Sequence, residues 1–184
     1  MIQLPPIPSW QALHPLVVHF PIALLLIAPL FVLAGVLLRG ERGRWLLISA
    51  LALMIAGTTG TFLARATGEA AGKVVGSSPQ LHAVLESHEE LAETTSLVFS
   101  VLTVTFAAIV LAPRFLRDTQ NGVVSSLLPL AFLLFYSAGA VLLMNTAHDG
   151  GRLVHEMGVH AVGAPARPVA AAPTSAVVNT RDPD

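Results

Sequence analysis

Four long apolar stretches, separated by short polar segments, make up most of the sequence. They run from Val17 to Leu38, from Trp45 to Ala64, from Leu91 to Ala112 and from Val123 to Asn145. Each has about 20 residues, the length that an α-helix needs to cross a hydrocarbon core roughly 30 Å thick. Helices satisfy their own backbone hydrogen bonds in lipid. The pattern therefore predicts an all-α integral membrane protein, a four-helix bundle with short turns.

The turns between the spans predict the orientation of the bundle. The first turn, RGERGR at residues 39–44, and the turn before the fourth span, with Arg114 and Arg117, are rich in arginine. Positive charge in short loops marks the cytoplasmic side of a membrane. We therefore expect a bacterial inner-membrane protein whose termini and outer loop, residues 65–90, face the periplasm. The short turns also make the first and second spans, and the third and fourth, antiparallel neighbours.

The remaining segments divide the chain into three parts. These are an outer N-terminal segment at residues 1–16, a transmembrane domain at residues 17–162, and a tail at residues 163–184. The tail is rich in alanine and proline and lacks periodicity, which is typical of disorder. The outer loop is predicted to be structured. Ser77 or Ser78, followed by Pro79, marks a helix start, and LHAVLESHEELAE continues that helix into the third span.

Composition narrows the classes of function. The chain has 184 residues, of which 54% are hydrophobic and 11% charged, whereas soluble domains average about 25% charged residues. The net charge of -1 gives no reason to expect nucleic-acid binding. Because the chain contains no cysteine, it forms no disulfide, iron–sulfur cluster, thiolate metal site or covalent c-type haem attachment.

Histidine is the residue type that points to chemistry, because every histidine falls at or beyond span ends that share the outer face. The seven are His14, His19, His82, His88, His148, His155 and His160. Imidazole is a ligand for haem iron, copper and zinc, and it titrates near neutral pH. This distribution predicts a cofactor site or proton site near the outer surface of an otherwise apolar bundle.

The first histidine motif, HPLVVHFP, opens the first span and contains His14 and His19. His14 stands at the interface, where an ordinary headgroup contact explains it as well as a ligand role does. His19 lies about one turn inside the span. A polar ring inside a span usually faces the bundle, so His19 is the stronger candidate.

The second motif, LHAVLESHEELAE, contains His82 and His88 among Glu86, Glu89 and Glu93. A carboxylate beside a histidine fixes which ring nitrogen faces a metal. An ordinary solvated acidic face is the equal alternative. Glu93 falls inside the predicted third span, where a carboxylate needs a partner such as a histidine, an arginine or a proton.

The third motif, NTAHDGGRLVHEMGVH, closes the fourth span. Gly150 and Gly151 are expected to break that span, after which a short helix carries His155 back over the mouth of the bundle. Arg152 either holds an anionic group, such as a haem propionate, or pairs with Asp149.

Bis-histidine ligation of haem needs one imidazole on each side of the porphyrin. His19 and His88 lie at similar depth and are the first candidate pair. A second haem nearer the surface would use His82 with His155, or His14 with His155. The propionates would meet Arg65, Lys73 or Arg152. Since b-type haem needs no cysteine, the composition is compatible with it.

The motifs HPLVVHFPIALL, TGEAAG, LHAVLESHEELA and AHDGGRLVHEMGV carry a family resemblance. With them, the chain resembles the bacterial four-span membrane proteins grouped as domain of unknown function 2231, over about residues 12–160. The resemblance implies a fold of four helices with an outer-face histidine set. Members associated with cytochrome-bearing proteins also imply an electron-transfer role. The positions that match the motifs are His14, His19, His82, His88 and His155, and no catalytic residue is carried over.

Three functions remain in competition. The leading hypothesis is a b-type haem protein with one or two haems, an electron-transfer subunit that works with a membrane or periplasmic redox partner. The alternatives are a zinc- or copper-binding membrane protein, and a structural or assembly subunit of a homo- or hetero-oligomer. An electron carrier or subunit is favoured over a stand-alone enzyme, because no serine or threonine sits in a recognisable nucleophile setting.

Overall fold

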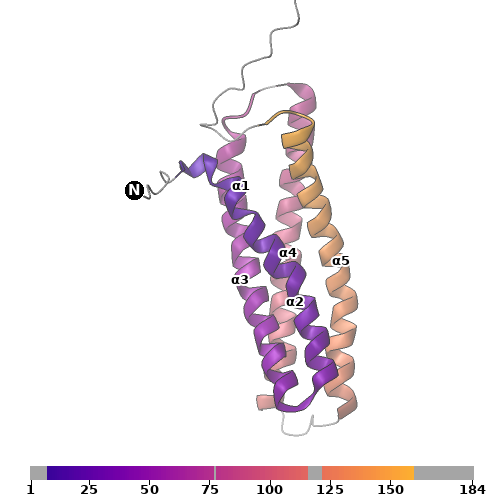
Figure 1. Cartoon of the computed structure of the whole chain (residues 1–184). Coiled ribbons are helices and arrows are strands. Elements are labelled where there is room, and N and C mark those ends of the chain that lie inside the picture. Colours follow the sequence, from indigo (N-terminus) through magenta and orange to yellow (C-terminus); the bar gives the residue numbers. More distant parts are fainter. Residues whose placement is uncertain (1–7, 77, 116–121, 160–184) are drawn as a thin grey trace, which may run out of the picture.

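A computed structural model describes residues 8–76, 78–115 and 122–159, nearly all of them helical (Figure 1). The elements are the 3₁₀-helix η1 (Trp10–Ala12) and the α-helices α1 (His14–Val17), α2 (His19–Leu38), α3 (Gly40–Gly72), α4 (Pro79–Phe115) and α5 (Gly122–His155). The predicted tail, residues 163–184, and His160 lie outside the described residues.

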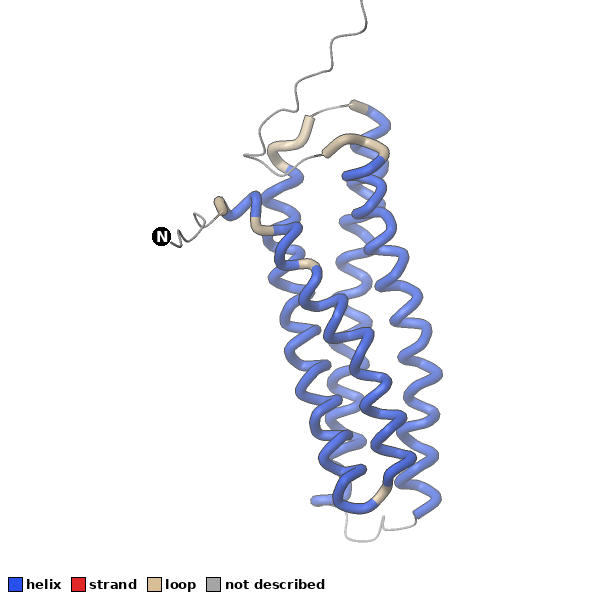
Figure 2. The backbone as a smooth tube through the Cα atoms, viewed as in Figure 1, coloured by secondary structure: helices blue, strands red, loops and turns tan. Residues whose placement is uncertain are grey.

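The long helices form one antiparallel bundle (Figure 2). α2 packs on α3 and α4 packs on α5, and the contacts of α3 with α4 and of α2 with α5 close the ring. We call α1, α2 and α3 the first hairpin, and α4 and α5 the second hairpin. Among the described residues, four helices are long and apolar enough to cross a membrane. The predicted all-α bundle with its two pairs of antiparallel neighbours is therefore confirmed.

The turn between α2 and α3 is very short. Arg39 (φ 47°) and Gly40 (φ 57°) both have a positive φ where the chain reverses. Gly35 and Gly43 then face each other at such close range that a Cβ on Gly43 would collide with the Gly35 carbonyl oxygen. Small residues let helix backbones approach closely in a membrane, so these two glycines fix the narrow end of the first hairpin.

Two prolines leave carbonyl groups without their helical donors. Pro21 has no N–H to offer the carbonyl of Val17, four residues earlier, and α1 ends at Val17. Pro29 likewise leaves the carbonyl of Leu25 unpaired, although α2 continues through it. The Tyr136 hydroxyl of α5 donates to the Leu25 oxygen at 2.6 Å. A backbone acceptor in the middle of the bundle is thus satisfied by the other hairpin.

The core changes character along the bundle. The middle and the arginine-turn end are filled by aromatic and aliphatic side chains, and the buried members include Leu25, Val32, Met54, Phe99, Phe106, Phe132 and Tyr136. The opposite end, which we call the histidine end, has a separate small cluster of Leu81, Val84 and Leu153. Between the two clusters lies a region lined by polar side chains, where the candidate site is found.

At the histidine end, α3 is longer than expected and extends to Gly72. α4 begins at Pro79, as predicted, so most of the outer loop is helical. The predicted helix start is confirmed, because the Ser78 hydroxyl oxygen accepts a hydrogen bond from the Leu81 N–H at 3.2 Å.

The predicted break at Gly150 and Gly151 is wrong, because α5 runs through both to His155. A glycine in a helix costs only about 1 kcal/mol relative to alanine. Packing of Leu153 against Leu81 and Val84 holds the last turns. α5 ends at His155, and Gly158, which has a φ of 68°, follows three residues later.

Candidate functional site

A cavity of about 1070 Å³ opens at the histidine end, between the two hairpins. Pockets for small molecules and cofactors measure about 300–1,000 Å³, so this one is large for the size of the protein. Its floor is apolar, with Ile22 and Leu143, and its walls carry polar groups. The titratable side chains in the lining are His14, His19, Arg65, Glu69, Glu86, His88, Glu89, Glu90, Glu93 and His155.

Two histidines from different hairpins meet in this cavity. The ring centres of His14, on α1, and His88, on α4, lie 6.4 Å apart, and the ring planes are nearly perpendicular at 80°. Both side chains are partly buried. The site is therefore organised around a pair of imidazoles separated by 74 positions in the sequence.

The first hairpin holds His14 by hydrogen bonds from one ring nitrogen. His14 Nδ1 lies 2.9 Å from the Ala64 carbonyl oxygen and 3.2 Å from Thr67 Oγ1, both on α3. Because a carbonyl only accepts hydrogen bonds, Nδ1 carries the proton, and in the neutral ring Nε2 keeps its lone pair. Gly68 makes room for the ring, since a Cβ there would stand 3.0 Å from His14 Cε1.

The second hairpin holds His88 in the same manner. His88 Nδ1 donates to the Thr146 carbonyl oxygen on α5 at 3.0 Å. A Cβ on Gly150 would stand 3.1 Å from His88 Cε1. The Thr146 hydroxyl bonds the Thr95 hydroxyl at 2.8 Å, which ties α5 to α4 one layer below the ring. Nε2 of His88 is thereby also left as the lone-pair nitrogen.

The two histidine supports correspond in sequence spacing. In each hairpin, a histidine near the start of the first span donates to a backbone carbonyl on the last helix, α3 or α5. On α3 the acceptor is Ala64, with Thr67 three positions later and Gly68 four positions later. On α5 the corresponding residues are Thr146, Asp149 and Gly150. The histidine pair therefore lies where the two hairpins meet, and each hairpin contributes one ring with its own acceptor.

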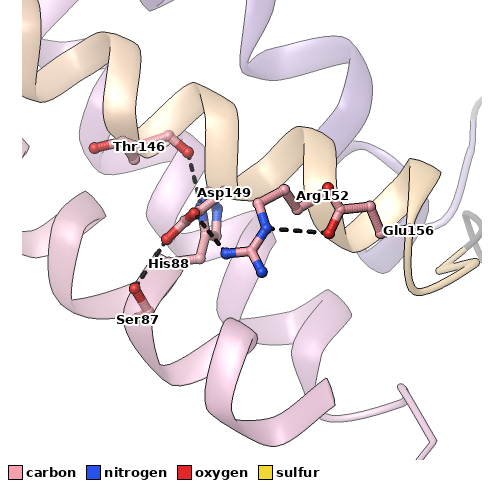
Figure 3. Close-up of polar contacts among 6 residues, drawn as sticks. All are labelled: Ser87, His88, Thr146, Asp149, Arg152 and Glu156. Atoms are coloured by element: carbon pink, nitrogen blue, oxygen red, sulfur yellow. Dashed lines mark hydrogen bonds and ion pairs between the residues drawn. The ribbon is translucent and has the colours of Figure 1, made fainter. Parts of the chain in front are cut away.

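The supports differ at the middle position. Thr67 is fully buried, and Asp149, at its equivalent, is 9% exposed. Asp149 accepts a hydrogen bond from Ser87 Oγ at 2.8 Å and pairs with Arg152 at 3.3 Å. Arg152 also donates to Glu156 at 3.2 Å. Figure 3 shows this chain of contacts running past the His88 ring.

The comparison with known families agrees with this architecture. A family model described as "Predicted membrane protein (DUF2231)" matches residues 11–163. The chain belongs to this family. The resemblance stated from the histidine motifs is thereby confirmed. No curated protein and no solved structure is significantly similar to the chain.

In this DUF2231 protein, the histidine pair differs from the first pair chosen from the sequence. His88 is one member, but its neighbour is His14. His19 is exposed, and its Nδ1 donates to the Pro15 carbonyl at 2.6 Å, within its own segment. The histidines considered for a second haem do not share one environment. His155 lines the cavity as an exposed side chain, whereas His82 is exposed and stands outside the lining.

The cationic candidates have acidic neighbours. Arg65 pairs with Glu93 across α3 and α4 at 3.8 Å, which supplies the partner that a carboxylate in the third span was expected to need. Arg152 adopts the simpler of its two expected roles and pairs with Asp149. Lys73 is exposed just after α3.

The expected zinc or copper ligand set is not assembled in the part of the chain that the structure describes. No group of three or more histidine, aspartate or glutamate side chains stands close enough there to hold a metal ion. Structural zinc sites use four protein ligands and catalytic zinc sites three. The described geometry brings together a pair of imidazoles, which is fewer ligands than either kind of zinc site uses.

The sequence analysis did not identify the groups that support the rings. From the sequence, Thr67 and Gly68 stand out only as part of the TGEAAG motif, Gly150 was expected to break the fourth span, and Thr146 had no assigned role. A detectable signal existed in the spacing. Ala64 and Gly68 are four residues apart, and so are Thr146 and Gly150. Each pair stands at the end of a span whose preceding span begins near a histidine.

Proposed function

We propose that the protein is a membrane-embedded b-type haem protein that carries electrons at the outer face of a bacterial inner membrane. His14 and His88 would be the residues that hold the haem iron. The observation that carries the proposal is the separation of their rings, 6.4 Å between centres. A metal ion lies about 2 Å from a ligating imidazole nitrogen, so the ring centres of two opposed ligands lie roughly 6 Å apart.

The supports of the two rings fit this role. Metal-bound histidines usually donate their other N–H to a carbonyl or carboxylate, which fixes the tautomer and the ring orientation. His14 and His88 both donate from Nδ1 to a backbone carbonyl. Nε2 is then the nitrogen available for ligation on each ring.

Haem also explains why two histidines are enough. The porphyrin supplies four ligands itself, and the bound group would contribute one-electron chemistry between ferrous and ferric iron. The protein's own groups would position it: the two imidazoles would hold it from opposite hairpins, and the apolar side chains of Ile22 and Leu143 would pack against it. The arginine-rich turns favour a periplasmic position of the histidine end, where a membrane or periplasmic redox protein would be the partner.

Visible absorption of the purified protein tests the proposal. The protein, produced with haem available and extracted in detergent, is expected to give a sharp α band and a shifted Soret band after reduction with dithionite. His14→Ala and His88→Ala are expected to abolish or reshape both bands. His82→Ala is the matched control, because this exposed histidine of the same helix as His88 lies outside the cavity.

Two results would refute the proposal. One is a flat spectrum from folded wild-type protein that was produced with haem available. The other is a haem spectrum that survives in both His14→Ala and His88→Ala. Circular dichroism of each variant separates loss of ligand from loss of helix. Elemental analysis of the wild-type protein tests the alternative, in which copper or zinc is bound instead.

A further inference from the structure

The Asp149 carboxylate is the main feature that distinguishes the two histidine supports. The other parts match: a carbonyl acceptor for Nδ1 and a glycine against the ring edge. At the middle position, a neutral hydroxyl contacts His14, and an aspartate takes its place beside His88. The two supports therefore differ in charge at one corresponding position, which is Thr67 in the first hairpin and Asp149 in the second.

We propose that Asp149 is a positioning residue that makes the two imidazoles electronically unequal, with His88 the more strongly donating ligand. This inference rests on the proposed haem site. A negative charge near an imidazole favours positive charge on the ring and on any metal bound to it. Asp149 would therefore stabilise the oxidised form of the centre and lower its reduction potential.

The contacts of Asp149 keep it charged and fixed. Ser87 Oγ and Arg152 Nη1 both donate to it, at 2.8 and 3.3 Å, one to each carboxylate oxygen. Ser87 precedes His88 directly, and Thr146, the acceptor of His88 Nδ1, lies one helical turn before Asp149. Figure 3 draws these contacts together, with Asp149 bonded to Ser87 and Arg152 and the His88 ring bonded to Thr146.

Arg152 provides an opposing charge. It bonds Asp149 on one side and the half-exposed Glu156 on the other, so the three side chains together carry one negative charge. Removing Asp149 leaves a neutral Arg152–Glu156 pair. Removing Arg152 leaves two negative charges. The two changes act on His88 with opposite signs, which simple damage to the structure does not produce.

Redox titration of haem-loaded variants tests the assignment. Asp149→Asn keeps the shape of the side chain and an acceptor for Ser87, and it is expected to shift the reduction potential to a more positive value. Arg152→Gln is expected to shift it to a more negative value. Glu156→Gln is the matched control, because it removes one negative charge from the other partner of Arg152, at an exposed position. A smaller positive shift is expected, because solvent screens the Glu156 charge. Shifts of the same sign in Asp149→Asn and Arg152→Gln, or none in either, would overturn the inference.

A measurement on the cofactor-free protein keeps this inference distinct from the haem proposal. In ¹⁵N spectra of the imidazoles, Asp149→Asn and Arg152→Gln are expected to move the His88 signals in opposite directions and to leave those of His14 near their wild-type positions. Equal displacement of His14 and His88 would overturn the role of Asp149. If the wild-type protein takes up no haem but this pattern is observed, the haem proposal alone fails.

Discussion

Gly150 and Gly151 are adjacent in α5, yet we expect different effects on stability when each is replaced by alanine. A Cβ on Gly151 meets no atom within 4 Å, whereas a Cβ on Gly150 would stand 3.1 Å from Cε1 of His88. Alanine is favoured over glycine in a helix interior by about 0.5–1 kcal/mol. Gly151→Ala should therefore raise the free energy of unfolding by that amount.

Gly150→Ala gains the same helix preference but displaces the ring. His88 must move by a few tenths of an ångström, which lengthens its 3.0 Å hydrogen bond to Thr146. A hydrogen bond of this kind contributes about 0.5–1.5 kcal/mol, so the gain and the loss nearly cancel. The two variants should differ by about 1 kcal/mol, or about 2–4 °C in the unfolding midpoint of a chain of this size.

Thermal unfolding in one detergent, followed by circular dichroism, measures this difference, with the wild-type protein as the reference. Ligand affinity gives a second readout, because Gly150→Ala moves a proposed ligand and Gly151→Ala does not. Equal stabilisation by the two substitutions, with unchanged ligand binding in both, would refute the role of Gly150 in seating His88.

Two further predictions concern contacts between the hairpins, and a third concerns the orientation of the bundle. Tyr136→Phe leaves the Leu25 carbonyl without a donor inside the bundle and is expected to lower the free energy of unfolding by about 1–3 kcal/mol; no loss in denaturant titration would contradict this. Glu93→Gln removes the 3.8 Å pair with Arg65, and because Glu93 is 70% exposed a change below about 1 kcal/mol is expected, measured by the same titration. A reporter active only in the cytoplasm, fused to the C-terminus, is expected to be silent, and strong activity would reverse the proposed orientation.

The fold followed from the sequence because length and hydropathy decide which segments can span a bilayer. The pattern located all four spans and Ser78 as a helix start. It underestimated how far α3 and α5 continue beyond the apolar stretches. Glycine and polar residues predict turns in water-exposed chains, but packing of Leu153 against Leu81 keeps the last turns of α5 helical.

The candidate site was predicted less completely. The sequence placed the histidines at one end, and it selected His88 because of its depth. It ranked His19 above His14, since it took the span to begin at Val17. The helix instead begins at His14, and α1 meets α2 at Val18. The direction in which the His14 ring points depends on that junction and on the Ala64 carbonyl of α3. Neither can be deduced from the spacing of residues within the first span.

The matched supports of His14 and His88 also bear on how such a protein can change over evolution. A site formed by two identical hairpin subunits about a twofold axis must carry the same residue on both sides, so any substitution is introduced twice. Joining the hairpins in one chain removes that constraint. A threonine and an aspartate can then occupy corresponding places, and each half can be altered by single mutations while the other preserves the framework.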